Sequence, residues 1–278
     1  MTFPPSFGSI KANVTVICMH ISADFAVVQL RIGGTAMEKN EKSALITGAS
    51  RGIGKAIAKQ FAREGYRLYL VCHKNKDMLE QFAISLEETF AVSVACFCGD
   101  ISDSSFVNTI FQNISRLDVL INNAGISHVG LLQDMTDDQW HHLIQTNLDS
   151  CFFTSRQAIP LMLKSGSGSI LNISSVWGVY GASMEVAYSA SKGGVNAFTR
   201  ALAKELAPSG ISVNAIACGL IDTEMNAHLS AEEMNRLFEE IPAGRSGKPE
   251  EVAQLSYQIA TGSSYLTGQI VSLDGGWF

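Results

Sequence analysis

Tyr188 and Lys192 are the two side chains in this sequence whose types and spacing most clearly suit proton chemistry. They stand four residues apart in Tyr-Ser-Ala-Ser-Lys, at the start of a predicted helix over residues 186–207, so both lie on one helix face. A tyrosine has a pKa of about 10 and is a poor base at neutral pH, but a nearby ammonium favours phenolate and lowers that pKa. The pair therefore predicts an acid–base group suited to exchange between a carbonyl and an alcohol.

Two more polar segments follow predicted strands. Ser175 ends a strand over residues 169–173 and lies thirteen residues before Tyr188. The residues Asn-Asn-Ala-Gly at 122–125 end another strand. The carboxyl ends of parallel strands border the ligand crevice of an open α/β sheet, so we expect these segments to meet there. Asn147 stands among apolar residues of a predicted helix, which indicates either a structural hydrogen bond or a role in the site.

A glycine-rich turn connects the first predicted strand to a helix. The glycines Gly48, Gly52 and Gly54 have the spacing G-x-x-x-G-x-G. Glycine lets the backbone approach a phosphate closely, and a helix N-terminus offers free N–H groups to an anion. The turn therefore predicts a pyrophosphate site, with a tight packing turn as the alternative.

The end of the second predicted strand indicates which dinucleotide is used. A dinucleotide fold places an acidic residue there to bind the ribose of NAD, or a basic one to bind the 2′-phosphate of NADP. His73 and Lys74 stand at this turn, Arg51 lies in the opposite loop, and Asp77 is too far along the chain. These cations favour NADP(H) over NAD(H).

Short apolar strands alternate with helical segments from residue 43 onward. This alternation indicates one doubly wound Rossmann-type α/β domain with a parallel seven-stranded sheet covered by helices on both faces. The strands are expected at residues 44–47, 68–72, 93–97, 119–122, 169–173, 212–215 and 269–273, and the helices at 54–64, 77–89, 104–115, 136–164, 186–207 and 249–261.

Residues 1–36 differ from the rest of the chain. They contain Pro4-Pro5 and Gly33-Gly34, with one possible strand over residues 13–18. We expect them to lie outside the fold, and residues 37–278 to form the catalytic domain. Initiation at Met37 is a further hypothesis.

Composition limits the remaining classes of protein. The 278 residues are 46% hydrophobic and 17% charged, with a formal net charge of −6, which argues against nucleic-acid binding. No apolar stretch reaches membrane-spanning length, and the histidines and six cysteines have no metal-site spacing. We expect a cytoplasmic protein with free thiols and no metal.

Together these motifs resemble the classical short-chain dehydrogenase/reductase family from residue 42 to 278. The resemblance implies that Tyr188 is the acid–base group, that Lys192 lowers its pKa and holds the nicotinamide ribose, and that Ser175 hydrogen-bonds the substrate oxygen. It also implies that Asn147 positions a water in a proton relay, that Asp100 and Ile101 face the adenine, and that Ile221 and Thr223 contact the nicotinamide. The cofactor contacts that it implies are made by Gly48, Ser50, Arg51, Gly52, Ile53, Gly54, His73, Lys74, Asp100, Ile101, Asn123, Ala124, Gly125, Tyr188, Lys192, Gly219, Ile221 and Thr223.

Within that family the sequence is most similar to 3-oxoacyl-[acyl-carrier-protein] reductases of fatty acid synthesis, through strings such as Gly-Lys-Pro-Glu-Glu-Val-Ala at 247–253. A hydroxysteroid or sugar/polyol dehydrogenase is the alternative, and a non-catalytic nucleotide-binding sensor is the alternative of another class. Lys164 is the cation nearest to where carrier-docking reductases have arginine, which weakens the expectation of a carrier partner.

The resemblance also implies a homotetramer, with one interface on the helices at 136–164 and 186–207 and another near Trp277 and Phe278. A mobile lid is expected over residues 222–240. Its apolar residues either face the substrate or pack the lid against the body, namely Met225, Leu229, Met234, Leu237 and Phe238. Cys218 replaces the proline that the family usually has there and is not expected to act as a nucleophile.

Overall fold

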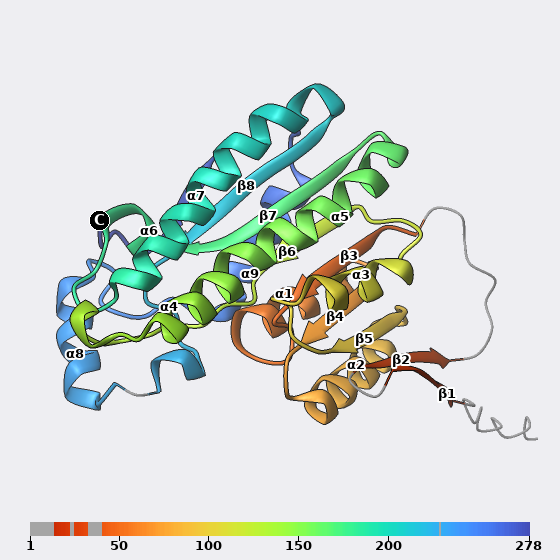
Figure 1. Ribbon diagram of the computed structural model, residues 1–278, viewed down its shortest axis with the longest axis horizontal. Coiled ribbons are helices and arrows are strands. Elements are labelled where there is room, and N and C mark those ends of the chain that lie inside the picture. Colours follow the sequence, from red (N-terminus) through yellow and green to blue (C-terminus); the bar gives the residue numbers. More distant parts are fainter. Residues whose placement is uncertain (1–13, 23–24, 33–40, 228) are drawn as a thin grey trace, which may run out of the picture.

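Seven parallel strands form the centre of the sheet in the structure, a computed structural model that describes residues 14–22, 25–32, 41–227 and 229–278 (Figure 1). Their spatial order is β5-β4-β3-β6-β7-β8-β9, so the order reverses at β3 and β6. Every neighbouring pair among the seven is parallel, which confirms the predicted α/β sheet. The strands are β3 (Ser43–Thr47), β4 (Arg67–Cys72), β5 (Val94–Cys98), β6 (Val119–Asn122), β7 (Gly168–Ser175), β8 (Ile211–Cys218) and β9 (Ile270–Leu273).

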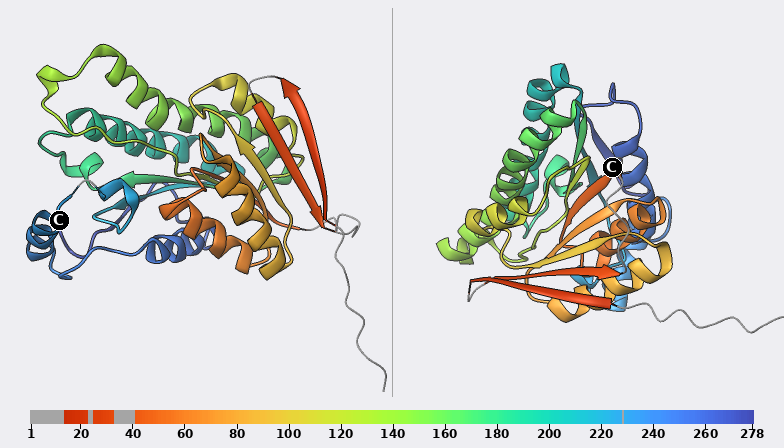
Figure 2. Two further views of the ribbon diagram at one scale, coloured as in Figure 1. Left: turned by 90° about the horizontal axis from the view of Figure 1, so that it is seen from below. Right: turned by 90° about the vertical axis from the view of Figure 1, so that its right-hand side faces the viewer.

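An antiparallel hairpin extends this sheet at the β5 edge. It consists of β1 (Val14–Ser22) and β2 (Phe25–Ile32), and β2 pairs antiparallel with β5. Figure 2 shows the red hairpin beside that edge. The prediction that residues 1–36 lie outside the fold therefore differs from the structure for these two strands. The physical reason is that an edge strand leaves a row of N–H and C=O groups open to pairing. Met37 and the rest of that segment lie outside the described residues.

Three helices cover each face of the parallel sheet, and Figure 2 shows the two layers on opposite sides. Apolar residues of α1 (Gly52–Arg63), α2 (Lys76–Phe90) and α9 (Pro249–Thr261) pack with one set of strand residues. Apolar residues of α3 (Ser104–Gln112), α5 (Ser150–Ser165) and α7 (Val186–Leu206) pack with the other set. The arrangement explains why the strands are apolar at nearly every position.

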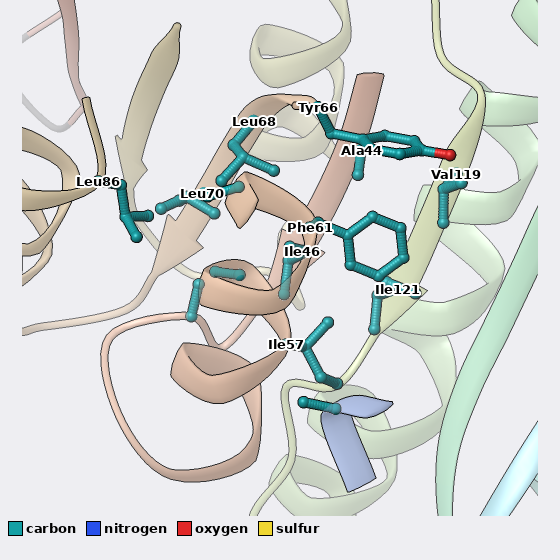
Figure 3. Close-up of a cluster of buried hydrophobic side chains, with 14 of the residues drawn as sticks. Ala44, Ile46, Ile57, Phe61, Tyr66, Leu68, Leu70, Leu86, Val119 and Ile121 are labelled. Atoms are coloured by element: carbon teal, nitrogen blue, oxygen red, sulfur yellow. The ribbon is translucent and has the colours of Figure 1, made fainter. Parts of the chain in front are cut away.

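The two cores alternate along each strand. Ile46 belongs to the first core and Leu45 to the second, because successive side chains of a strand point to opposite faces. Figure 3 shows Ile57 and Phe61 of α1 facing Ile46 and Ile121 of the sheet. All of these side chains are completely buried. This packing fixes the N-terminal end of α1 against the carboxyl ends of β3 and β6.

The predicted helix over 136–164 is interrupted in the structure. It consists of α4 (Asp137–Ile144), a π-helical turn (Gln145–Asp149) and α5. Such π-helical turns are rare and occur mostly at functional sites. The short helix α6 (Trp177–Tyr180) follows β7, and α8 (Ala231–Glu240) lies within the predicted lid, whose mobility stays a prediction. Among the described residues, no helix is long and apolar enough to cross a membrane.

Candidate active site

A cavity of about 830 Å³ opens at the carboxyl ends of the central strands. This volume is at the upper end of what small-molecule sites occupy. It is lined by residues that follow β3, β4, β5, β6, β7 and β8. Its lining includes most of the predicted site residues, namely Gly48, Ser50, Arg51, Ile53, His73, Lys74, Asp100, Ile101, Asn123, Ala124, Gly125, Ser175, Tyr188, Lys192, Gly219, Ile221 and Thr223.

The glycine turn brings the backbone against the strand beside it. Gly48 has φ +66°, a conformation that favours glycine. A Cβ at Gly54 would lie 2.2 Å from the carbonyl oxygen of Gly48, so a side chain there would force the turn to move. Gly52 and Gly54 are outside the described cavity lining. They act on the site by shaping the loop, whereas Gly48, Ser50 and Arg51 face the cavity.

Thr47 and Asn123 fix this loop to the end of β6. The Thr47 hydroxyl accepts hydrogen bonds from the backbone N–H groups of Asn123 and Ala124, both at 2.9 Å. The Asn123 side chain donates in return to the carbonyl oxygens of Thr47 at 2.9 Å and of Gly48 at 3.2 Å. The Asn-Asn-Ala-Gly motif is therefore a structural clamp on the predicted phosphate loop as well as part of the cavity wall.

The far end of the cavity carries the predicted 2′-phosphate cations. His73 and Lys74 are both exposed and line the cavity. Arg51 also lines it, and its guanidinium makes an ion pair of 2.8 Å with Glu224 across the opening. Both partners are more than half exposed, so the pair contributes little to stability. The structure thus connects the glycine loop to the predicted lid through Arg51.

Asp100 lies beside these cations after β5. Its carboxylate accepts hydrogen bonds from the backbone N–H of Ser102 at 2.9 Å and from the Ser102 hydroxyl at 2.7 Å. Burial by itself raises the pKa of Asp100, but the Ser102 hydrogen bonds and the charges of His73 and His142 lower it overall. The carboxylate is therefore held ionised and oriented at the cavity wall.

Ser175, Tyr188 and Lys192 meet in the middle of the cavity. The Ser175 side chain lies near the Tyr188 phenol and lowers its pKa. The Lys192 ammonium lies 5.7 Å from the centre of the Tyr188 ring and donates a 2.8 Å hydrogen bond to the carbonyl oxygen of Ile173. Ser175 and Lys192 are 7% and 5% exposed, whereas Tyr188 is half-buried, so the site is partly shielded from bulk water. The structure confirms that the helix spacing brings phenol and ammonium together.

Burial dominates the pKa of the Tyr188 phenol. Burial raises the pKa of Tyr188, and the nearby Ser175 side chain opposes this only in part. Burial also lowers the pKa of Lys192, whose ammonium donates its hydrogen bond to the carbonyl oxygen of Ile173. Desolvation is therefore the largest effect on the phenol, and the lowering of the tyrosine pKa by Lys192 stays a prediction. The phenol is kept in its neutral, proton-donating form.

Asn147 stabilises the segments behind the cavity wall through its side-chain hydrogen bonds. Its side-chain oxygen accepts a 2.8 Å hydrogen bond from the N–H of Ile126, and its amide donates to the Ile126 carbonyl at 2.9 Å and the Ser191 hydroxyl at 3.0 Å. Asn147 is 1% exposed and is not among the described residues that line the cavity. Its side chain therefore makes structural hydrogen bonds that connect the π-helical turn, the loop after β6 and α7.

Cys218 ends β8 near Tyr188 and Lys192. The thiol is buried, and burial raises the pKa of Cys218 to about 12, although the charge of Lys192 opposes this. A thiol with this pKa is not a nucleophile at neutral pH. Its carbonyl oxygen accepts a 3.0 Å hydrogen bond from the N–H of Val176, which fixes the segment that follows Ser175.

The sequence also matches a known family. A family model described as short chain dehydrogenase matches residues 42–234, which include the glycine loop and the Ser175, Tyr188 and Lys192 cluster. The chain belongs to the short chain dehydrogenase family. It is therefore an oxidoreductase acting on CH–OH and C=O groups, with a fold that binds a nicotinamide cofactor.

Relatives of this short chain dehydrogenase span nearly its whole parallel-sheet domain. The uncharacterized oxidoreductase YmfI of Bacillus subtilis is 39% identical, over 85% of this chain and 98% of that protein. The 3-oxoacyl-[acyl-carrier-protein] reductase FabG of Thermotoga maritima is 40% identical, over 86% and 99%. A structure assigned provisionally as an NAD(P)-dependent gluconate 5-dehydrogenase from Beutenbergia cavernae, with bound NADP, has a TM-score of 0.80 and 33% identity, over 86% and 98%.

Several residues of the dehydrogenase cavity were not identified from the sequence. His142 lines the cavity, and its charge is one of the effects that lower the pKa of Asp100. Trp177 and Trp277 also line it, whereas the resemblance placed the C-terminal tail near a subunit interface. Trp177 could have been found, because it follows Ser175 by two residues. Trp277 could not, because its position depends on how the chain turns after β9.

Proposed function

We propose that this chain is an NADPH-dependent reductase that converts the ketone of a 3-oxoacyl thioester to a secondary alcohol. The observation that carries the proposal is that Ser175, Tyr188 and Lys192 line one cavity together with the glycine loop, with the Lys192 ammonium 5.7 Å from the centre of the Tyr188 ring. The identity of 40% to the Thermotoga maritima reductase supports this substrate class.

Tyr188 is the proton donor of the proposed reaction. Because burial raises its pKa, the phenol carries its proton at neutral pH and can give it to the ketone oxygen. Ser175 hydrogen-bonds the same oxygen as negative charge develops on it. When bound, the nicotinamide supplies a hydride to the carbonyl carbon, so that one hydride and one proton convert C=O to CH–OH. The positive charge of Lys192 then stabilises the phenolate that remains.

The residues at the phosphate end of the cavity fit a dinucleotide. The space at Gly54 is closed to any side chain, and this lets the loop backbone approach a phosphate. In the proposal, Gly48, Ser50 and Gly125 line the path of the dinucleotide. Asp100 and Ile101 contact the adenine, and Ile221, Thr223 and Gly219 contact the nicotinamide half.

Other dehydrogenase substrates are a second candidate function. The structural similarity to a provisionally assigned gluconate 5-dehydrogenase favours oxidation of a sugar acid or polyol. A hydroxysteroid alcohol belongs to the same chemical class. The non-catalytic sensor is disfavoured, because nucleotide binding alone does not need Ser175, Tyr188 and Lys192 together in the cavity lining.

The proposed function is tested by NADPH oxidation with the purified protein. The substrate panel contains an acetoacetyl thioester, an oxosteroid and an oxo-sugar, and absorbance of NADPH is followed. We expect the thioester to have the highest kcat/KM. A higher value for the oxosteroid or oxo-sugar would assign the alternative substrate class, and no turnover of any ketone would contradict the reductase.

Lys74→Ala is expected to weaken NADPH binding by about tenfold or more and to leave NADH binding unchanged. Lys74 is an exposed cation at the 2′ end of the cavity, and a hydrogen bond to a charged group contributes about 1.5–3 kcal/mol. Isothermal titration of both cofactors measures the effect. Lys76→Ala is the matched control, because Lys76 lies outside the described cavity lining and pairs with Glu80 at 3.8 Å. Tighter binding of NADH than NADPH by the unaltered protein would contradict the NADP preference.

The proposal includes a homotetramer with α5 and α7 at one interface. Phe152 of α5 is 44% exposed, and its ring lies 5.4 Å from that of Phe153. An outward apolar patch of this kind supports association with a second copy. The proposal also includes residues 37–278 as the catalytic unit and a cytoplasmic location. Acyl carrier protein is the proposed partner that delivers the thioester.

A further inference from the structure

We propose that the C-terminal Trp277 and the Trp177 indole form an aromatic wall that selects ketones with a large apolar substituent on the carbonyl carbon, an acyl chain or an aryl ring. This inference rests on the proposed ketone reduction and adds its specificity. The aromatic wall consists of Trp177, Tyr180, Trp277 and Phe278.

The four rings of the aromatic wall contact one another. The ring centres of Trp177 and Trp277 are 5.1 Å apart at 62°, and Trp177 meets Phe278 edge-on at 5.5 Å. Phe278 stacks on Tyr180 at 4.5 Å with an angle of 23°. These are the spacings and orientations that aromatic pairs prefer. The two indoles line the cavity, and the outer rings of Tyr180 and Phe278 support them.

The aromatic wall begins next to the group that holds the ketone oxygen. The backbone N–H of Trp177 donates a 3.2 Å hydrogen bond to the Ser175 hydroxyl. An oxygen bound to Ser175 and Tyr188 therefore leaves one substituent of its carbonyl carbon on the side of the Trp177 indole. A flat indole offers a large apolar contact surface and loses little conformational entropy on binding.

The C-terminal tail is anchored so that Trp277 reaches this place. Gly275 and Gly276 have φ values of +71° and +83°, which turn the chain back after β9. The Gly275 carbonyl accepts a 3.0 Å hydrogen bond from the N–H of Ala243, and the Gly276 N–H donates at 3.0 Å to Asp274. The tail is thus part of the substrate pocket and is fixed by backbone contacts with the segment after α8.

The rest of the cavity lining is also rich in apolar side chains. Val129 comes from the loop after β6, and Met225, Leu229 and Leu237 come from the predicted lid. Ser127, Glu185 and Asn226 add polar atoms to the lining, enough for a thioester group. A polyhydroxylated substrate would place hydroxyls against the indoles without hydrogen-bond partners, which is costly. The apolar substituent is therefore the better occupant.

The experiment compares three thioesters that share one reacting group. Acetoacetyl thioester has a short substituent, 3-oxodecanoyl thioester a long chain, and 3-oxo-3-phenylpropionyl thioester a ring. For the unaltered protein we expect kcat/KM to be at least about tenfold higher for one or both of the larger substrates. An additional methylene in an apolar pocket can by itself change kcat/KM by about tenfold or more. Whichever of the two larger thioesters has the higher kcat/KM identifies the chain or the ring as the preferred substituent.

Trp277→Ala is expected to lower kcat/KM for the larger thioesters by about tenfold or more relative to the acetoacetyl thioester, so that the preference disappears. Trp277→Phe keeps a ring and should restore much of it, and unchanged NADPH affinity verifies the fold of both variants. Tyr265→Ala is the control, because Tyr265 is 97% exposed and outside the described cavity lining.

Equal kcat/KM for all three thioesters in the unaltered protein would overturn the aromatic wall while leaving ketone reduction intact. An equal loss of kcat/KM for all three thioesters in Trp277→Ala would also overturn the aromatic wall. Absence of turnover with every thioester and with an oxo-sugar would instead contradict the proposed reductase itself.

Discussion

Replacing Tyr188 by Phe is expected to reduce the turnover of ketone reduction by at least about a hundredfold, while NADPH still binds. The phenol lines the cavity together with Ser175 and, through its raised pKa, holds a proton at neutral pH. Removing one hydroxyl leaves the ring and its packing in place. General acid catalysis contributes about a hundredfold to ten-thousandfold in rate, which sets the lower limit of the expected loss.

The measurement is the steady-state rate of NADPH oxidation with a saturating thioester, together with the NADPH dissociation constant. Tyr66→Phe is the matched control, because Tyr66 is also buried but belongs to the core beneath α1 and α9. It should retain full turnover. A Tyr188→Phe protein with unchanged turnover would refute the role of this phenol. Loss of NADPH binding together with turnover would show that the hydroxyl is needed for the pocket itself.

Lys192→Met is expected to lower turnover by about a hundredfold or more without lowering the melting temperature. Lys192 is 5% exposed and its ammonium hydrogen-bonds a carbonyl oxygen, with no carboxylate paired to it among the described salt bridges. Burial lowers its pKa, so the charged form costs free energy in the folded state. Methionine fills a similar volume without that cost, but it cannot stabilise the phenolate that forms as Tyr188 gives up its proton.

Thermal unfolding followed by circular dichroism, in parallel with NADPH oxidation, separates the two effects. Lys204→Met on the exposed face of the same helix is the control, and it should change neither quantity. A melting temperature that falls by several degrees in Lys192→Met would show that this lysine is mainly structural. A gain or no change in stability with lost turnover is the pattern of a residue retained for chemistry at the expense of stability.

Much of the architecture could be predicted from local patterns. The seven strands of the parallel sheet appear in the structure near their predicted positions, because a strand covered on both faces must be apolar at nearly every residue. The Tyr188 and Lys192 pair could be predicted for a similar reason, because a four-residue spacing on a helix brings the two side chains together whatever surrounds it. The glycine loop is a third local pattern, since its turn depends on residues next to each other in the chain.

Features that depend on contacts between distant segments could not be predicted. The pKa of Tyr188 depends on how far other elements bury it, and Lys192 donates its hydrogen bond to a carbonyl oxygen of β7. Asn147 makes its hydrogen bonds to Ile126 and Ser191, which lie 21 and 44 residues away. The pairing of β2 with the edge strand β5 could not be predicted, because the sequence of that segment did not indicate a strand that belongs to the sheet.

The sequence alone was sufficient to predict the parallel sheet and the placing of Tyr188 and Lys192 on one helix face, because each is encoded by short-range periodicity or spacing. The combination of its motifs was sufficient for the family. Packing had to be known before the shape and polarity of the substrate end could be described. Trp177 and Trp277 are one hundred residues apart in the chain, and their rings meet at 5.1 Å only because β9 places the C-terminal tail beside α6. Desolvation and ring contacts of this kind are properties of the folded chain, since no single segment contains both partners.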